Sequence, residues 1–298
     1  MSQPKVILIT EAPGSLGNLT AGALGHGGHT VYAALQDCRG GNRAQATRLR
    51  AYAREQGIDI RPIELNPTAD RSATCAIARI LREQGRIDVI LHNALPRIFG
   101  PAEAFSTAQL ARAHDRSILG TQRLMRAALP AMRRQSQGLM AWLISSASTG
   151  GAAPYLAFHC AIVAGLEAMA VQYAREIAPW GIESSIVVAG MFSEAVMPLT
   201  DALQPDDTAR VTEYEAGATQ GLAEAIREAV RRVTPAGAIL GAAAGAVAMI
   251  VDLPAGERPF RFYVDPVRDG AEVVIPVMDR VRDEMIGRLG LTGRLAPP

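Results

Sequence analysis

Residues 5–17 read KVILITEAPGSLG, an apolar run followed by a turn that contains two glycines. A continuous apolar run such as Lys5 to Thr10 is typical of a strand buried on both faces of a sheet. A helical stretch rich in Ala, Leu and Gly follows the turn, from Asn18 to Gly28. The order of strand, glycine-containing turn and helix predicts the first unit of a βαβ fold.

The same alternation continues along the chain. Strands are predicted at 30–34, 60–65, 88–93, 139–145 and 183–188, and helices at 43–56, 71–83, 109–134 and 158–178. Strands separated by helices of this length are joined by right-handed crossovers, which make them parallel. The sequence therefore predicts an α/β fold, a single Rossmann-like domain over residues 1–298 in which helices cover both faces of a doubly wound parallel sheet.

The region after Gly190 differs in composition from the alternating strands and helices before it. A polar, proline-containing segment at 193–213 precedes helices predicted at 218–233 and 241–250. Because open α/β sheets bind ligands beyond the carboxyl ends of their strands, residues 191–234 are a candidate substrate lid, and a packing appendage is the alternative. Residues 261–298 are predicted to supply a C-terminal strand (261–264) and helix (271–289).

The composition narrows the range of partners. The 298 residues are 49% hydrophobic and 20% charged with a net charge of +1, so nothing predicts binding to nucleic acid or a membrane. Three cysteines without C-x-x-C spacing and scattered histidines predict neither a disulfide framework nor a metal site. The N-terminal apolar run is too short for a secretory signal, so we expect a cytoplasmic protein with a small-molecule substrate.

Four features, in chain order, carry a resemblance to a known family. They are the turn at 10–17, Asn93-Ala94 after the fourth strand, Ser145-Ser146 after the fifth, and Trp180-Gly181-Ile182 before the sixth. The stretches 119–132 and 172–182 add to it, so the similarity spans nearly the whole chain. On these features the chain resembles the short-chain dehydrogenase/reductase family, as a divergent member. The resemblance implies a nicotinamide dinucleotide at the first turn and a homodimer or homotetramer.

Several positions at which the family contacts its cofactor are altered. The family's Thr-Gly-x-x-x-Gly-x-Gly turn lets backbone N–H groups approach a pyrophosphate, but Glu11 and Ser15 replace the first two of its glycines. The family's aspartate near the adenine is Asn66, the glycine of its Asn-Ala-Gly signature is Leu95, and its Pro-Gly is Ala189-Gly190. A Glu11 carboxylate facing a phosphate would cost about 1–4 kcal/mol, unless it swings to solvent.

These departures predict that NAD(P)(H) is absent or weakly bound. The choice between NAD and NADP stays open, because Arg39 or Arg43 would suit a 2′-phosphate whereas Asp37 would suit a ribose hydroxyl. If a dinucleotide binds, the resemblance implies contacts from Thr10, Gly14, Ser15, Gly17, Gln36, Asn66 and Asn93.

The catalytic positions are altered too. The family's serine lies thirteen residues before a tyrosine, and a lysine follows four residues later on the same helix face. Counting from Ser146 places His159 at the tyrosine position and Val163 at the lysine position. Tyr155 lies only nine residues after Ser146, and Lys5 is the only lysine in the chain. Because histidine titrates near neutral pH unaided, Ser146 and His159 are the candidate proton-transfer pair; packing or capping is the alternative for His159.

Three functions from different classes follow. The favoured one is a redox-neutral enzyme that catalyses an isomerisation, dehydration, cyclisation or retro-aldol step, with His159 as acid/base and Ser146 as oxygen anchor. The alternatives are an NAD(P)H-dependent carbonyl or alcohol oxidoreductase with an atypical site, and a non-catalytic protein that binds a small molecule or a partner protein. A largely apolar, oxygenated substrate is expected, in a pocket formed by Leu95, Ser148, Tyr155, Gly190, Met191, Phe192 and Tyr214.

Overall fold

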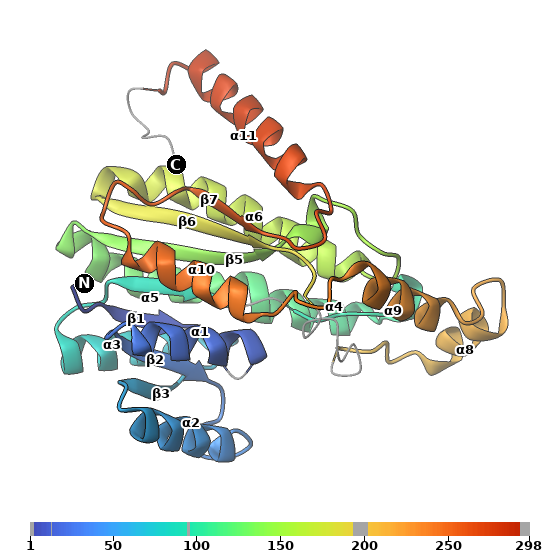
Figure 1. Ribbon diagram of the computed structural model, residues 1–298, viewed down its shortest axis with the longest axis horizontal. Coiled ribbons are helices and arrows are strands. Elements are labelled where there is room, and N and C mark those ends of the chain that lie inside the picture. Colours follow the sequence, from blue (N-terminus) through green and yellow to red (C-terminus); the bar gives the residue numbers. More distant parts are fainter. Residues whose placement is uncertain (1–2, 13, 94–95, 193–201, 293–298) are drawn as a thin grey trace.

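A seven-stranded parallel sheet forms the centre of the molecule (Figure 1). The computed structural model describes residues 3–12, 14–93, 96–192 and 202–292, without the side chain of Ser15. The strand order is β3-β2-β1-β4-β5-β6-β7. The strands are β1 (Val6–Ile9), β2 (Thr30–Leu35), β3 (Ile60–Glu64), β4 (Val89–His92), β5 (Gly138–Ser145), β6 (Ile182–Ala189) and β7 (Arg261–Val264). The predicted fold class is confirmed.

Helices cover both faces of the sheet (Figure 1). One face packs against α1 (Ser15–His26), α2 (Arg43–Gln56) and α10 (Gly241–Asp252). The other packs against α3 (Asp70–Gln84), α5 (Gly120–Gln135) and α6 (Ala157–Ile177). All four residues of β1 are buried, as its unbroken apolar sequence requires.

The predicted helix at 109–134 is present, and its middle turn is π-helical. It comprises α4 (Thr107–His114), a π-helical turn (Asp115–Leu119) and then α5. The sequence analysis did not predict the π-helical turn. Arg123 fixes the turn by donating hydrogen bonds to the carbonyl and the carboxylate of Asp115.

Two short helices stand apart from the sheet, on the right in Figure 1. They are α8 (Thr208–Ala216) and α9 (Leu222–Val233). The side chain of Asp207 caps α8 by accepting the Arg210 N–H. Gly221 adopts a left-handed conformation, with φ of 73°, immediately before α9. Both helices lie within the candidate lid, whose role stays a prediction.

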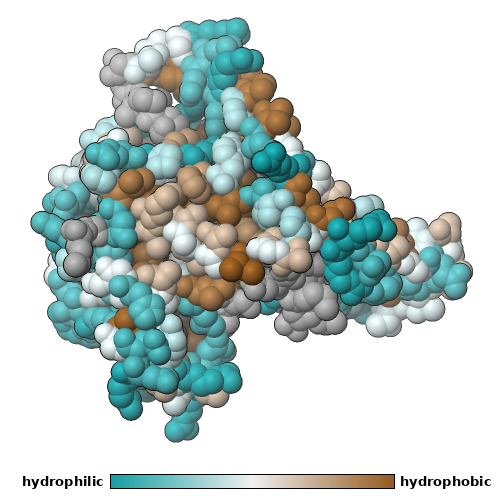
Figure 2. Space-filling view, viewed as in Figure 1, coloured by the Kyte–Doolittle hydropathy of each residue, from teal (hydrophilic) through white to brown (hydrophobic). Residues whose placement is uncertain are grey.

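The C-terminal helix α11 (Ala271–Arg288) leans away from the domain at the top of Figure 1. Figure 2 shows hydrophobic residues along it. Its exposed apolar side chains recur every fourth residue, at Val273, Val277, Val281, Met285 and Leu289. The described residues leave this stripe uncovered, and the expected homo-oligomer stays a prediction.

One described stretch, Ala157–Trp180, has the length and the mean hydropathy, 1.3, of a membrane-spanning helix. It comprises α6 and the short helix η4 (Ala178–Trp180). Ile162, Val163, Leu166 and Ala170 of α6 are buried in the core. We therefore interpret it as a core helix of the domain, and the expected cytoplasmic location stays a prediction.

Candidate active site

The predicted site residues gather at one edge of the sheet because all the strands are parallel. Thr10 follows β1, Asn93 follows β4, Ser146 follows β5 and Gly190 follows β6. The strand order reverses between β1 and β4, which is where open α/β sheets bind ligands. The candidate site therefore lies where this fold class forms its crevice.

The turn between β1 and α1 is tied to the end of β4. The Thr10 hydroxyl donates to the Leu91 carbonyl at 3.3 Å and accepts the Asn93 N–H at 2.9 Å. The Asn93 amide donates to the Glu11 carbonyl at 3.3 Å. A Cβ on Gly17 would lie 2.8 Å from the Ala12 Cα, so only glycine fits there. These contacts hold the turn in shape although two of the family's glycines are replaced.

The N-terminus of α1 retains the features of an anion site. Gly14 is the N-cap residue, and α1 has no side-chain cap among the described residues. A Cβ placed on Gly14 would meet no described atom within 4 Å. The first N–H groups of a helix lack partners within the helix and attract phosphate groups. This end of α1 therefore fits the pyrophosphate of a dinucleotide.

Glu11 neither faces that space as an unpaired anion nor swings free into solvent, the two alternatives considered from the sequence. Its carboxylate pairs with Arg116 of the π-helical turn, with 2.6 Å between Oε1 and Nε. Arg116 also donates to the Gln36 side-chain oxygen at 3.2 Å. The negative charge introduced at the turn is therefore matched by a positive charge from a distant segment.

A cavity opens beside this ion pair, at the carboxyl ends of β1 and β2. Its walls include Gln36, Leu65 and Pro67, and Thr121 and Leu124 of α5. It combines an apolar floor with a few polar groups, as nucleotide pockets commonly do. Asn66 lies between two wall residues, but its side-chain oxygen accepts the N–H and hydroxyl of Thr68 and does not line the cavity.

Ser146 and His159, the candidate proton-transfer pair, have different hydrogen-bond partners in the structure. Ser146 begins the short helix η3 (Ser146–Ser148) and is 1% exposed. Its hydroxyl hydrogen-bonds to the carboxyl group of Asp269. The elements that carry Ser146 and His159 are in contact, because the Cys160 thiol of α6 donates to the Ala147 carbonyl of η3 at 3.2 Å.

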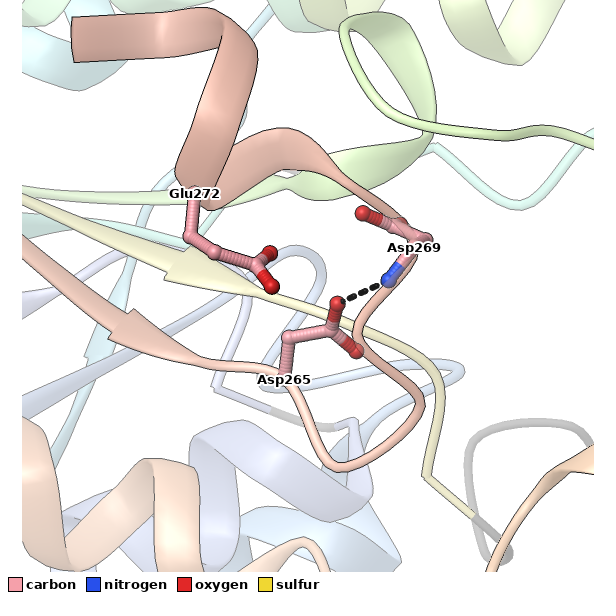
Figure 3. A group of neighbouring side chains, drawn as sticks. All are labelled: Asp265, Asp269 and Glu272. Carbon is pink, nitrogen blue, oxygen red and sulfur yellow. Dashed lines mark hydrogen bonds between the residues drawn. The ribbon is translucent and has the colours of Figure 1, made fainter.

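Asp269 lies on the loop 265–270, which joins β7 to α11 (Figure 3). The Asp265 carboxylate accepts the Asp269 N–H at 2.7 Å. Burial raises the pKa of Asp269, and the neighbouring Asp265 raises it further, whereas the hydrogen bond from Ser146 opposes the shift. A carboxyl group is therefore placed directly against the candidate serine.

Glu272, at the start of α11, completes an acidic group with Asp265 and Asp269, whose oxygens lie within 4.8 Å of one another (Figure 3). Asp265 also accepts the Val267 N–H, and Asp269 accepts the Ala271 N–H. These bonds account for the clustering as loop structure, and the group gives no argument for a metal.

His159 lies in the first turn of α6, and its ring environment is well defined. Nδ1 is 2.7 Å from the Pro96 carbonyl oxygen. A carbonyl only accepts hydrogen bonds, so Nδ1 carries the proton and Nε2 carries the lone pair in the neutral ring. Burial lowers the pKa of His159, and the Pro96 bond offsets this in part. The neutral ring therefore presents a base at Nε2.

Val163 occupies the position of the family's lysine, and its side chain is fully buried in the core. It packs with Ile162 and Leu166 of the same helix. No charged group therefore stands one helical turn after His159. The lowered pKa of the imidazole has burial as its main cause and involves no neighbouring ammonium group.

The structure separates the predicted pocket residues. Tyr155 lines a second cavity with Arg227 of α9, and its ring meets Phe99 edge to face. Phe192 is 2% exposed and packs in the core, and the Tyr214 hydroxyl donates to Glu103 on the surface. The remaining predicted residues do not meet in either cavity: Ser148 bonds to Thr149, Gly190 donates its N–H to Val264, Met191 follows it half-buried, and Leu95 lies outside the described residues.

Two functional candidates were missed from the sequence. Arg116 lies 105 residues from Glu11, and Asp269 lies 123 residues from Ser146. Neither stands in a motif of spaced residues. Only the predicted edge of the parallel sheet, where the ends of distant strands converge, would have directed attention to them.

Comparison with known proteins defines the class to which this site belongs. Residues 5–203 match the family model described as short chain dehydrogenase. The chain therefore belongs to the short-chain dehydrogenase/reductase family, as its motifs predicted.

Two curated relatives are oxidoreductases by name. A 3-ketodihydrosphingosine reductase from Bacteroides thetaiotaomicron is 29% identical over 193 residues, which cover 64% of this chain and 65% of that protein. A 17-beta-hydroxysteroid dehydrogenase type 1 from Mus musculus is 32% identical over 193 residues, which cover 63% and 54%. The chain thus spans between about half and two thirds of the length of these relatives.

Solved structures share the whole fold. A short-chain dehydrogenase from Streptomyces avermitilis superposes with a TM-score of 0.72 at 23% identity, and 98% of each chain is covered. A gluconate 5-dehydrogenase from Burkholderia cenocepacia, in complex with NADP and tartrate, gives a TM-score of 0.67 at 19% identity, with 88% and 94% covered.

These findings correct the prediction that NAD(P)(H) is absent or weakly bound, since fold neighbours hold NADP and the named relatives are oxidoreductases. The prediction counted altered residues at several positions that contact the cofactor. It did not foresee that Arg116 pairs with Glu11. The comparisons also favour the oxidoreductase alternative over the redox-neutral enzyme.

Proposed function

We propose that the chain is a nicotinamide-dependent oxidoreductase that interconverts a secondary alcohol and a ketone on a small, largely apolar molecule. The observation that carries this proposal is the N-terminus of α1, which no described side chain caps, next to a cavity at the end of β2. The relatives support the reaction class, since they are named for reducing a keto group or oxidising a hydroxyl group.

The residues present fit a dinucleotide. The N-terminus of α1, beside Gly14 and Gly17, would hold the pyrophosphate, and the cavity beside Gln36 would hold the adenosine. Asn93 keeps the turn in place from the end of β4. A bound nicotinamide would supply the hydride chemistry at the alcohol carbon, which leaves one proton for the protein to move.

His159 is the group proposed to move that proton. Its Nδ1–H is held by the Pro96 carbonyl, so the neutral ring accepts the alcohol proton at Nε2 as the hydride leaves. In the reverse direction the imidazolium returns the proton to the ketone oxygen. Because burial lowers the pKa, the ring is neutral at pH 7, and alcohol oxidation is the direction that its resting state serves.

Ser146 is proposed to act as a positioning residue and not as His159's partner. Its hydroxyl is engaged by Asp269 and almost completely covered. This contact fastens the loop 265–270 to the end of β5, next to the first turn of α6. The two residues are therefore expected to affect turnover differently. Loss of His159 would remove the base, whereas loss of Ser146 would only loosen the surrounding loop.

Substrate contacts are proposed to come from the region 191–234, within which α8 and α9 line the second cavity. This cavity contains Phe99, Tyr155 and Pro205 among its walls, which offer an apolar surface. The aliphatic or ring skeleton of the substrate would lie against these side chains. An NAD(P)+-dependent assay with secondary alcohols of increasing apolar size tests the substrate class.

The proton-transfer role is tested with H159A and the exposed-site control H26A. H159A is expected to lose about 10²–10⁴-fold in kcat, with cofactor affinity unchanged, whereas H26A retains wild-type kcat. S146A is expected to lose much less than H159A. Retention of full turnover by H159A, or no binding of any nicotinamide dinucleotide at millimolar concentration, would contradict the proposal.

A further inference from the structure

Arg116 lines the cavity at the end of β2. Its Nε lies 2.6 Å from Glu11 Oε1 and its Nη1 lies 3.2 Å from Gln36 Oε1, so the guanidinium bridges the β1–α1 turn and the second strand. Among the described residues, Glu11 and Arg116 are the charged side chains that line the cavity. Arg116 is also 49% exposed, which leaves it accessible to a ligand.

The end of β2 is where a dinucleotide fold distinguishes its two cofactors. A carboxylate about twenty residues after the glycine turn accepts the ribose 2′-hydroxyl of NAD, whereas a nearby arginine accepts the 2′-phosphate of NADP. Asp37 has the right position in the sequence, but its two oxygens accept the N–H groups of Gly40 and Gly41. It also does not line the cavity. Asp37 therefore holds its own loop and is not part of the cavity wall.

The other groups near the end of β2 do not offer a phosphate site. Glu64 accepts the N–H groups of Asp37 and Cys38, both at 2.7 Å, so these amides are used. Arg39 and Arg43, the cations considered from the sequence, are not among the residues lining the cavity. Among the described residues, Arg116 is the cation that lines the cavity.

We propose, building on the proposed function, that Arg116 binds the 2′-phosphate of NADP and makes the chain NADP-dependent. The guanidinium offers several N–H donors in a planar fork that suits a phosphate. Gln36 contributes as well, because its amide can turn its NH₂ group toward the phosphate once Arg116 releases its oxygen. Glu11 competes with the phosphate for the same guanidinium, and Arg116 comes from a π-helical turn, an element that is frequent at functional sites.

The test uses calorimetric titration with 2′,5′-ADP and 5′-AMP, which differ only in the 2′-phosphate and need no turnover. The wild-type chain is expected to bind 2′,5′-ADP at least ten-fold more tightly than 5′-AMP. R116A is expected to lose about 10- to 100-fold for 2′,5′-ADP and little for 5′-AMP. R116K should retain part of the preference, and R43A should retain all of it. E11Q, which removes the competing carboxylate, should tighten binding of 2′,5′-ADP.

The outcomes separate this inference from the proposed function. Equal losses for both probes in R116A, restored in E11Q/R116A, would mean that Arg116 only neutralises Glu11 and would overturn the inference. A wild-type preference for 5′-AMP, or for NAD+ over NADP+, would overturn it too while leaving the proposed oxidoreductase intact. Failure of the folded wild-type chain to bind either dinucleotide would instead reject the proposed function. A thermal unfolding curve for each variant establishes that it is folded.

Discussion

Glu167 connects the loop after Ser146 to the C-terminal part of the chain, and its removal gives the sharpest stability prediction. Its side chain is 5% exposed on α6. It accepts hydrogen bonds from Arg261 of β7 at 3.1 Å and from the Thr149 hydroxyl at 3.2 Å. Arg261 is 6% exposed and also pairs with Asp279 of α11. One carboxylate therefore joins three segments.

E167A is expected to cost about 3 kcal/mol of unfolding free energy. Removing one member of a buried ion pair typically costs about 3–5 kcal/mol, and the low end applies because Asp279 still accompanies Arg261. Total stabilities are about 5–15 kcal/mol, so the loss is a large fraction of the whole. With a urea dependence of about 3 kcal/mol per molar for a chain of this size, the midpoint should fall by about 1 M.

Urea unfolding followed by circular dichroism provides the measurement, with E284Q as the control. Glu284 pairs with Arg280 at 3.8 Å, and both side chains are more than half exposed. Such a surface pair contributes well under 1 kcal/mol, so E284Q should unfold with the wild type. If E167A unfolds within about 0.5 kcal/mol of the wild type, the smallest difference expected of a lost buried contact, then Asp279 alone satisfies Arg261 and the reasoning fails.

Three further results are expected. G17A should weaken dinucleotide binding and lower the melting temperature, because its Cβ would meet Ala12 Cα at 2.8 Å; G237A, at a site with open space, is the control in both assays. Alcohol oxidation should remain fast below pH 6.5, because burial lowers the pKa of His159 and keeps it a base; an activity loss centred at or above pH 6.5, measured as kcat against pH, would contradict this. Burial and Asp265 raise the folded-state pKa of Asp269, so wild-type stability should fall as pH rises from about 3.8 through that raised pKa. D269N should lack this fall in denaturant titrations across the range, and parallel curves for the two proteins would refute the assignment.

The sequence was sufficient for the fold because each strand carries its own signal. Residues 6–9, VILI, are all apolar, and the structure buries all of β1. The π-helical turn at Asp115–Leu119 was not predicted, because contacts with a distant segment help to hold it. What stabilises it is Arg123, whose guanidinium contacts Asp115 and the distant Pro67 carbonyl. Local patterns do not encode such contacts.

The candidate site was predictable in position and less so in chemistry. Counting from Ser146 identified His159 and Val163, and the structure puts the first in a turn facing Pro96 and the second in the core. The choice of which ring nitrogen of His159 carries the proton is set by the Pro96 carbonyl, which lies 63 residues earlier in the chain. The partner of Ser146 comes from the loop after the last strand. Hydrogen-bond partners set by tertiary structure decide what these side chains can do.

The pairing of Glu11 with Arg116 bears on how altered motifs are interpreted. Glu11 considered alone predicts repulsion of a phosphate. In the structure an arginine from a third segment pairs with Glu11 and also contacts Gln36. The pair adds no net charge to the cavity, so a dinucleotide phosphate at the turn would meet a neutral pair and not a lone carboxylate. A carboxylate introduced into a cofactor motif therefore indicates lost binding only when no distant side chain neutralises it, and here Arg116 does so.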